Sequence, residues 1–120
     1  MKIHILSAVL SLIFLASGIA KLASLEFEMA AFARWGYALW FMYVIGLLEV
    51  MGGIGLILQR LAGLSSIGLA LLMLGALATH LQHAEWGMLA VASIILLLTL
   101  TRVWLGRAQL SRMASHIFAR

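Results

Sequence analysis

Four apolar segments, each long enough to cross a lipid bilayer, occupy most of this 120-residue chain. A transmembrane helix needs roughly 20 mainly apolar residues, and a helix satisfies its own backbone hydrogen bonds inside lipid. The segments run over residues 3–25, 35–58, 61–81 and 86–105. The sequence therefore predicts an all-α fold, a polytopic four-helix transmembrane bundle over residues 1–105, with a tail over residues 106–120.

The composition agrees with a membrane protein and excludes several kinds of chemistry. Hydrophobic residues make up 65% of the chain and charged residues only 10%, far from the soluble average of roughly half and a quarter. The absence of cysteine removes disulfides, thiol relays and iron–sulfur clusters. The net charge of +4 forms no compact basic patch with exposed aromatics, so we expect no nucleic-acid partner.

The distribution of basic residues predicts how the bundle is oriented. Four spans place both termini on one side, and most Lys and Arg residues fall there: Lys2, Arg60, Arg102, Arg107, Arg112 and Arg120. Positive charge accumulates on cytoplasmic loops, so we expect both termini in the cytoplasm and the protein in a bacterial inner membrane. Arg102 lies within the last span, and we expect its side chain to extend toward the lipid headgroups.

The first span also has features of a secretory signal peptide. Lys2 precedes an apolar stretch, and the small residues Gly18 and Ala20 resemble a cleavage site. The apolar stretch is longer than a signal peptide requires, so we expect the span to be retained.

Two polar segments should lie at the membrane surface as amphipathic helices. Residues 26–36 lack turn-forming residues and are too polar to span the membrane. The tail combines basic residues with an apolar face formed by Leu110, Met113, Ala114, Ile117 and Phe118. We interpret the tail as a binding segment for anionic lipid, with docking of a peripheral partner protein as the alternative.

Three ionisable residues are predicted within the spans: Lys21, Glu49 and His80. Such residues are rare in membranes and normally face the bundle interior. Small residues share their helix faces, notably Gly18, Gly46, Gly52 and Gly53, and small residues allow membrane helices to approach closely. We therefore expect the three side chains to converge in the outer half of the bundle, with Thr79 as a further polar neighbour.

This predicted cluster has two interpretations. It could be a clamp that only fixes helix register, or a polar pocket for a small ligand or exchangeable proton. A metal site is not expected, since His80 and His83 have no third ligand fixed by spacing. Haem between His4 and His116 is likewise not expected.

The segments "LSLIFLASGIAKL", "GLLEVMGGIGLIL" and "LLMLGALATHL" resemble the DoxX and DoxX-like family of small four-helix bacterial membrane proteins. The resemblance spans residues 7–105 and rests on Gly18 with Lys21, Glu49 before Gly52 and Gly53, and His80. It implies a redox or quinone connection, because the family's namesake is a subunit of a thiosulfate:quinone oxidoreductase.

Two hypotheses about function follow. In the first, the protein is a redox-associated or accessory subunit without an intrinsic cofactor, whose polar pocket binds a quinone-like or other small amphipathic molecule. In the second, it is a structural or assembly subunit of a larger membrane complex. A channel would require a homo-oligomer, for which "GGIG" at residues 52–55 could provide close helix contacts. The sequence does not decide whether the protein is an enzyme.

Overall fold

In a computed structural model that describes residues 2–118, and side chains as far as residue 115, the chain forms six α-helices and no strand. The helices are α1 (Lys2–Leu22), α2 (Glu26–Trp35), α3 (Leu39–Ile57), α4 (Ala62–Gln82), α5 (Trp86–Leu105) and α6 (Arg107–Phe118). Four of them, α1, α3, α4 and α5, are long and apolar enough to cross a membrane. The prediction of an all-α, four-helix membrane bundle is confirmed.

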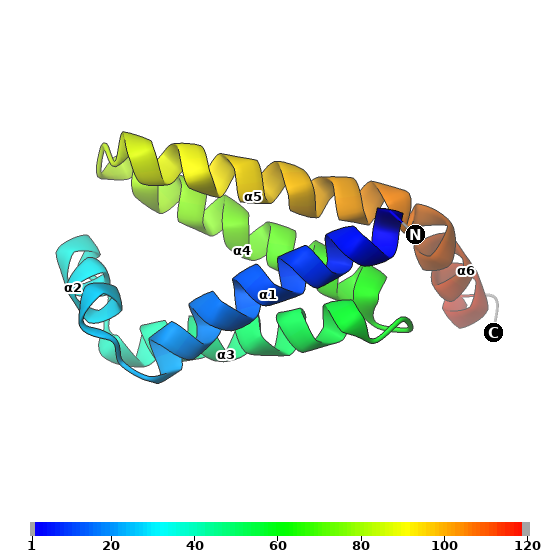
Figure 1. Cartoon of the computed structure of the whole chain (residues 1–120), viewed down its shortest axis with the longest axis horizontal. Coiled ribbons are helices and arrows are strands. Elements are labelled where there is room, and N and C mark those ends of the chain that lie inside the picture. The colour runs from blue at the N-terminus through cyan, green and yellow to red at the C-terminus, as the bar shows by residue number, and fades with distance from the viewer. Residues whose placement is uncertain (1, 119–120) are drawn as a thin grey trace.

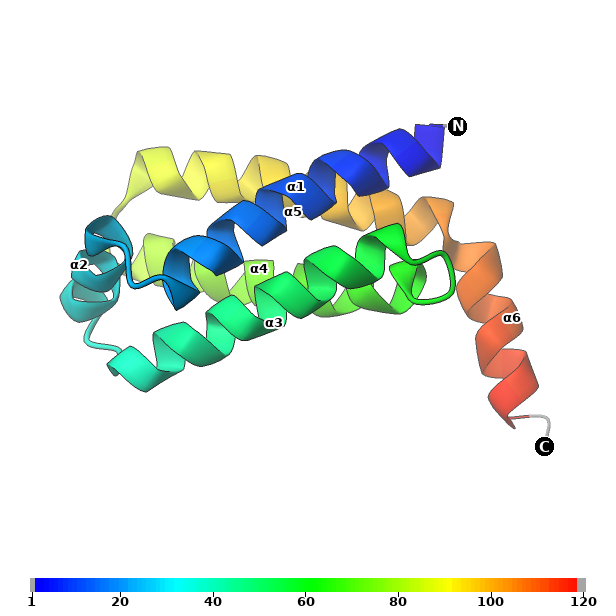
Figure 2. The same ribbon diagram turned by 60° about the horizontal axis from the view of Figure 1, so that its bottom comes forward.

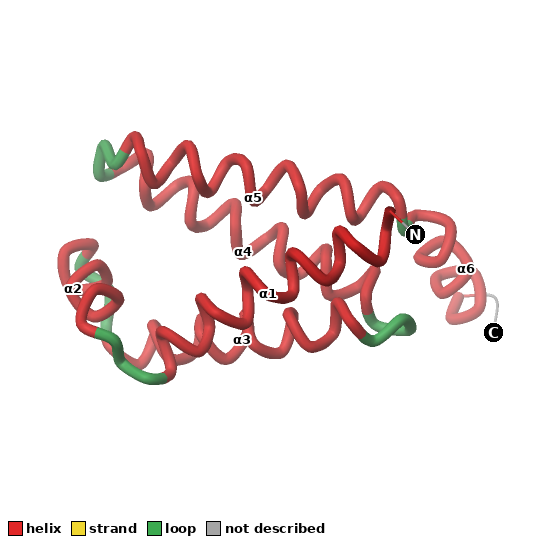
Figure 3. Tube along the Cα trace, in the orientation of Figure 1, coloured by secondary structure: helices red, strands yellow, loops and turns green. Residues whose placement is uncertain are grey.

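The four long helices run side by side, and the short helices lie at opposite ends of the bundle (Figure 1). α1 packs mainly against α3, and α4 mainly against α5. One end, here named the α2 end, holds α2 and the α4–α5 connection. The other, named the terminal end, holds the start of α1, α6 and the α3–α4 connection (Figure 2). The connections are short and confined to these ends (Figure 3), so the long helices alternate in direction.

The outward surface of the long helices is apolar, as a bilayer-facing surface must be. Leu12, Leu71 and Leu97, for example, are each more than half exposed. The buried core is small and centres on Leu10, Phe14, Leu69 and Leu96. Since a water-soluble protein rarely exposes so much contiguous apolar surface, lipid contact accounts for the distribution.

Two helix ends at the α2 end differ from the ends of the predicted spans. Trp35 ends α2 instead of beginning the second span, because Gly36 takes a left-handed φ of 82° and its N–H bonds back to the Ala33 carbonyl. Glycine adopts this conformation without a Cβ clash, so α3 begins only at Leu39. α1 ends at Leu22, before a left-handed turn at Ser24.

The tail forms a helix that folds back onto the α3–α4 connection. Gln109 Nε2 donates a hydrogen bond to the Gln59 carbonyl at 2.7 Å, and Leu110 packs against Gly63 of α4. The side chains of Ile117, Phe118 and Arg120, which the sequence assigned to this amphipathic tail, lie outside the described residues.

Candidate polar site within the bundle

Lys21 and Glu49 form a buried ion pair between α1 and α3. Lys21 Nζ lies 2.8 Å from Glu49 Oε1, and the two residues are only 9% and 6% exposed. The contact lacks hydrogen-bond geometry at Oε1, so its attraction is mainly ionic. In a low-dielectric interior, this proximity offsets part of the cost of burying each charge, and removing one partner would leave the other uncompensated.

Close packing of the two helices makes this pair possible. A Cβ atom added to Gly18 would lie 2.6 Å from the Gly46 carbonyl oxygen, and one added to Gly46 would lie 2.8 Å from Lys21 Cβ. Ser11 Oγ donates to the Gly53 carbonyl at 2.7 Å nearby. Glycine therefore sets how near α1 and α3 approach. Gly52 faces the other way, against Leu69 of α4.

Lys21 also binds two partners that the sequence did not identify. Its Nζ donates to Ser17 Oγ at 2.8 Å and to Glu28 Oε2, on α2, at 2.9 Å. One ammonium group thus faces two carboxylates, so the group carries a formal charge of −1 unless it binds a proton. Glu28 lies seven residues after Lys21, and a turn at Ser24 separates them. The sequence does not predict the direction of this turn, so it does not predict the contact.

His80 is held by Glu85 rather than by Glu49. His80 Nδ1 lies 2.9 Å from Glu85 Oε1, and because a carboxylate only accepts, Nδ1 carries the hydrogen. The other ring nitrogen, Nε2, is then the one that can exchange a proton. This contact too was missed in the sequence, where Glu85 belongs to a loop.

Glu85, in the α4–α5 connection, binds side chains of both α2 and α4. Arg34 NH2 lies 2.6 Å from Oε2, and Trp35 Nε1 donates to Oε1 at 3.0 Å. The hydrogen bond from His80, with smaller contributions from Arg34 and Trp35, outweighs burial and lowers the pKa of Glu85 to about 2. Glu85 is therefore ionised at neutral pH and holds three donors.

Glu49 and His80 nevertheless line one cavity. It has a volume of about 310 Å³ and lies between α1, α3, α4 and α5. Ser17 adds a hydroxyl, and the remaining wall is apolar: Ile13, Phe14, Met73, Gly87, Met88, Val91, Ala92 and Ile95. The structure thus places a carboxylate and an imidazole around one mostly apolar space without joining them by a described contact.

Thr79 lies apart from this cavity. Its hydroxyl donates to the Gly75 carbonyl at 3.0 Å and pairs with the Tyr37 hydroxyl at 2.8 Å. It lines a separate space of about 320 Å³ with Phe32, Trp35, Tyr37 and Phe41. The sequence groups Thr79 with Lys21, Glu49 and His80, but the structure does not bring it to the Lys21–Glu49 pair.

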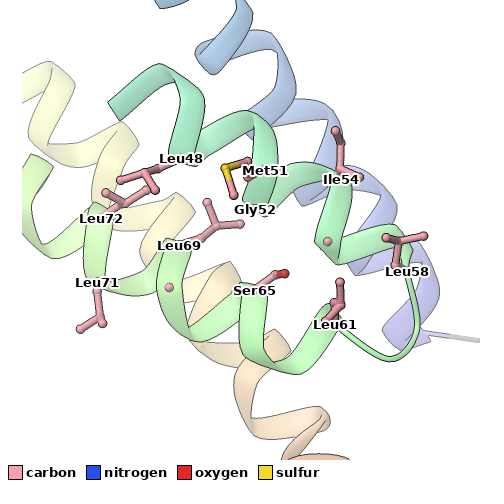
Figure 4. A pocket seen from close by; sticks show the side chains of 12 residues that line it. Leu48, Met51, Gly52, Ile54, Leu58, Leu61, Ser65, Leu69, Leu71 and Leu72 are labelled. Atoms are coloured by element: carbon pink, nitrogen blue, oxygen red, sulfur yellow. The ribbon is translucent and has the colours of Figure 1, made fainter. Parts of the chain in front are cut away.

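A wider groove of about 680 Å³ runs between α3 and α4 (Figure 4). Leu48, Met51, Leu69 and Leu72 contribute to its wall, and Ser65 is its one polar side chain among the described residues. It has no titratable group, so it offers no acid–base chemistry.

Arg102 corrects another expectation. Instead of extending to the headgroups, Arg102 is only 5% exposed, and its Nε donates to Ser7 Oγ of α1 at 2.6 Å. A hydroxyl on the facing helix is near enough to bind it, so the side chain turns inward.

Comparison with known proteins gives the following matches. Residues 5–102 match the model of the DoxX-like family. The uncharacterized protein YdgD of Bacillus subtilis (strain 168) is 28% identical over 102 residues, covering 81% of this chain and 90% of that protein. No solved structure matches the chain.

Proposed function

The chain belongs to the DoxX-like family of membrane proteins, and we propose that its cavity beside Glu49 and His80 binds a quinone-like or other small amphipathic molecule. In this proposal the protein is a redox-associated or accessory subunit of the bacterial inner membrane. The quinone class comes from the family resemblance, and the geometry supports the more general class of small amphipathic ligands.

The shared cavity of Glu49 and His80 is the observation that carries the proposal. Ligand pockets are mostly apolar with a few placed polar groups, and this cavity of about 310 Å³ has that character. A quinone offers two carbonyl oxygens, each of which needs a hydrogen-bond donor or a proton when the ring is reduced.

The residues around the cavity suit proton exchange. His80, with Nδ1 bonded to Glu85, can donate to a quinone oxygen through Nε2 only as the imidazolium. Glu49 can donate only after the Lys21, Glu28 and Glu49 group has taken up a proton from the aqueous phase. The electrons would come from a redox partner, since the chain has no cysteine to carry them. Binding and proton supply are therefore the roles assigned to this chain.

The alternative is a structural subunit in which the polar residues only clamp the helices. The observation that favours it is the connectivity of Lys21, which joins α1 to both α2 and α3. In that case Glu49→Gln lowers thermal stability in detergent while a partner protein still copurifies.

Binding of a short-chain quinone, decylubiquinone, to the purified protein separates these readings. By equilibrium dialysis in detergent, Glu49→Gln and His80→Gln should each weaken binding about tenfold, the loss expected for one charge-assisted hydrogen bond. Glu26→Gln, an exposed carboxylate on α2, is the matched control and should bind as the wild type does. No saturable binding to the folded wild type, or equal binding by all variants, would refute the proposal.

A further inference from the structure

Arg102 lies in a second polar cavity, at the terminal end of the bundle. The cavity has a volume of about 330 Å³, and Arg102 lines it together with Ser7, His4, Gln59 and Gln109. Its apolar wall includes Ile3, Ala8, Leu56, Ile57 and Ala62. The polar lining residues come from four elements, α1, the α3–α4 connection, α5 and α6, which meet around one buried guanidinium.

The guanidinium is only partly satisfied by the protein. Its Nε is bonded to Ser7 Oγ, but NH1 is buried without a hydrogen-bond partner among the described residues. NH1 packs against Gly106, where a Cβ atom would collide with it. Because NH1 is enclosed by Gly106, a ligand in the cavity would bind Arg102 through NH2, for which no hydrogen bond is described. Ser7, which accepts from Nε, keeps its own O–H to donate.

Among the described residues, no acidic side chain is placed to neutralise this charge. The sequence contains four acidic residues and no more: Glu26, Glu28, Glu49 and Glu85. Glu28 and Glu49 contact Lys21, and Glu85 contacts His80 and Arg34, while Glu26 belongs to α2 at the opposite end (Figure 1). A buried cation without a counter-charge is strongly disfavoured, so an anion bound from outside the chain would stabilise it.

We propose that this cavity binds a phosphate group through Arg102. The planar guanidinium matches phosphate oxygens with paired donors, and Ser7 and Gln109 add polar groups to the same space. The phosphate belongs either to the headgroup of an anionic phospholipid or to a soluble phosphate. Arg60 and Arg107 lie in elements at this end and would concentrate either anion.

Native mass spectrometry of the detergent-solubilised protein tests this site. The protein is titrated with phosphatidylglycerol, and with diacylglycerol of the same acyl chains, which lacks the phosphate. The wild type should prefer phosphatidylglycerol about tenfold or more, the factor expected for one charge-assisted contact. If the wild type binds the two lipids equally and does not bind inorganic phosphate, the proposal is overturned. This test uses the wild-type protein alone.

Variants locate the site. Arg102→Gln should abolish the preference, whereas Arg112→Gln, which removes the same charge from exposed α6, should change it less than about twofold. Where Arg102→Gln does not fold, Arg102→Lys keeps the charge but loses the planar fork and should reduce the preference several-fold. A preference that survives both Arg102 variants contradicts the assignment.

Inorganic phosphate distinguishes the two sources. If millimolar phosphate displaces phosphatidylglycerol from the wild type but not from the Arg102 variants, the site recognises free phosphate. If the lipid remains bound, the headgroup is the ligand.

Discussion

Lys21 supplies the positive charge that compensates two buried or partly buried carboxylates, Glu28 and Glu49. Its ammonium group lies within 2.9 Å of a carboxylate oxygen on each of two other helices, Glu28 on α2 and Glu49 on α3. Either carboxylate would be difficult to bury alone, because an uncompensated charge in a low-dielectric interior loses its hydration without a substitute. Removing the cation should therefore cost more than removing either anion.

A double-mutant cycle tests this dependence. Lys21→Met should lower the free energy of unfolding by about 3–5 kcal/mol, the range for a buried pair that loses one partner. Adding Glu49→Gln should recover part of this loss, because it removes the carboxylate left without a cation. The measurement is denaturant unfolding in mixed micelles, followed by circular dichroism, with the terminal Lys2→Met as control. Strict additivity of the two changes would mean that the pair contributes no coupling.

At the scale of elements, the contact between α1 and α3 is set by backbone proximity. A Cβ at Gly18 would meet backbone atoms of Gly46 and Val50 within 3.0 Å, and backbone cannot move aside as a side chain can. We expect Gly18→Ala to lower the free energy of unfolding by about 1–3 kcal/mol through overpacking.

Gly68 provides the matched control for this substitution. It also lies within a long helix, α4, but a Cβ added there meets nothing within 4 Å. Gly68→Ala should therefore be neutral or stabilising by up to about 1 kcal/mol through helix propensity. The same unfolding titration compares the two, and equal effects would show that the α1–α3 approach is not the cause.

The attachment of α2 should depend on pH through Glu85. Its pKa in the folded protein, about 2, lies below the ordinary value of 4.5, so the ionised form is the one that the fold stabilises. The contribution is complete above about pH 4.5 and is lost as the pH falls toward 2. At neutral pH Glu85 therefore secures Arg34, Trp35 and His80.

A nitroxide label can follow this attachment, because the chain has no native cysteine. In Ala30→Cys, on an exposed site of α2, label mobility should rise as the pH falls below about 4.5 toward 2. Glu85→Gln should raise the mobility at neutral pH, and Glu26→Gln should not. A label whose mobility is the same at pH 7 in the Glu85→Gln background would show that other contacts hold α2.

At the scale of the whole molecule, the start of α1 and all of α6 lie at one end of the bundle (Figure 1). The basic residues predict that this end is cytoplasmic. Single cysteines at Glu26 and Gln59, one at each end, test the orientation in intact cells. We expect a membrane-impermeant maleimide, applied from outside, to label Glu26→Cys and to leave Gln59→Cys unlabelled until the membrane is lysed. The reverse pattern would invert the topology.

The sequence by itself determined the four spans, the common end of the termini and the two short amphipathic helices. Each of these follows from the hydropathy and charge of consecutive residues. A bilayer excludes polar side chains and unpaired polar backbone groups, so apolar segments span it as helices and charged segments stay at its surface. The same reasoning identified Lys21, Glu49 and His80 as ionisable residues within the membrane.

Only the tertiary structure decided which of these residues meet. Pairing depends on the depth and rotation of each helix, and these follow from contacts such as the approach of Gly18 to Gly46. The connecting segments supplied Glu28 and Glu85, whose directions are set by turns at Ser24 and Ala84 with positive φ. Hydropathy contains no information on rotation, so Lys21 with Glu49, His80 with Glu85, and Arg102 with Ser7 could be assigned only in three dimensions.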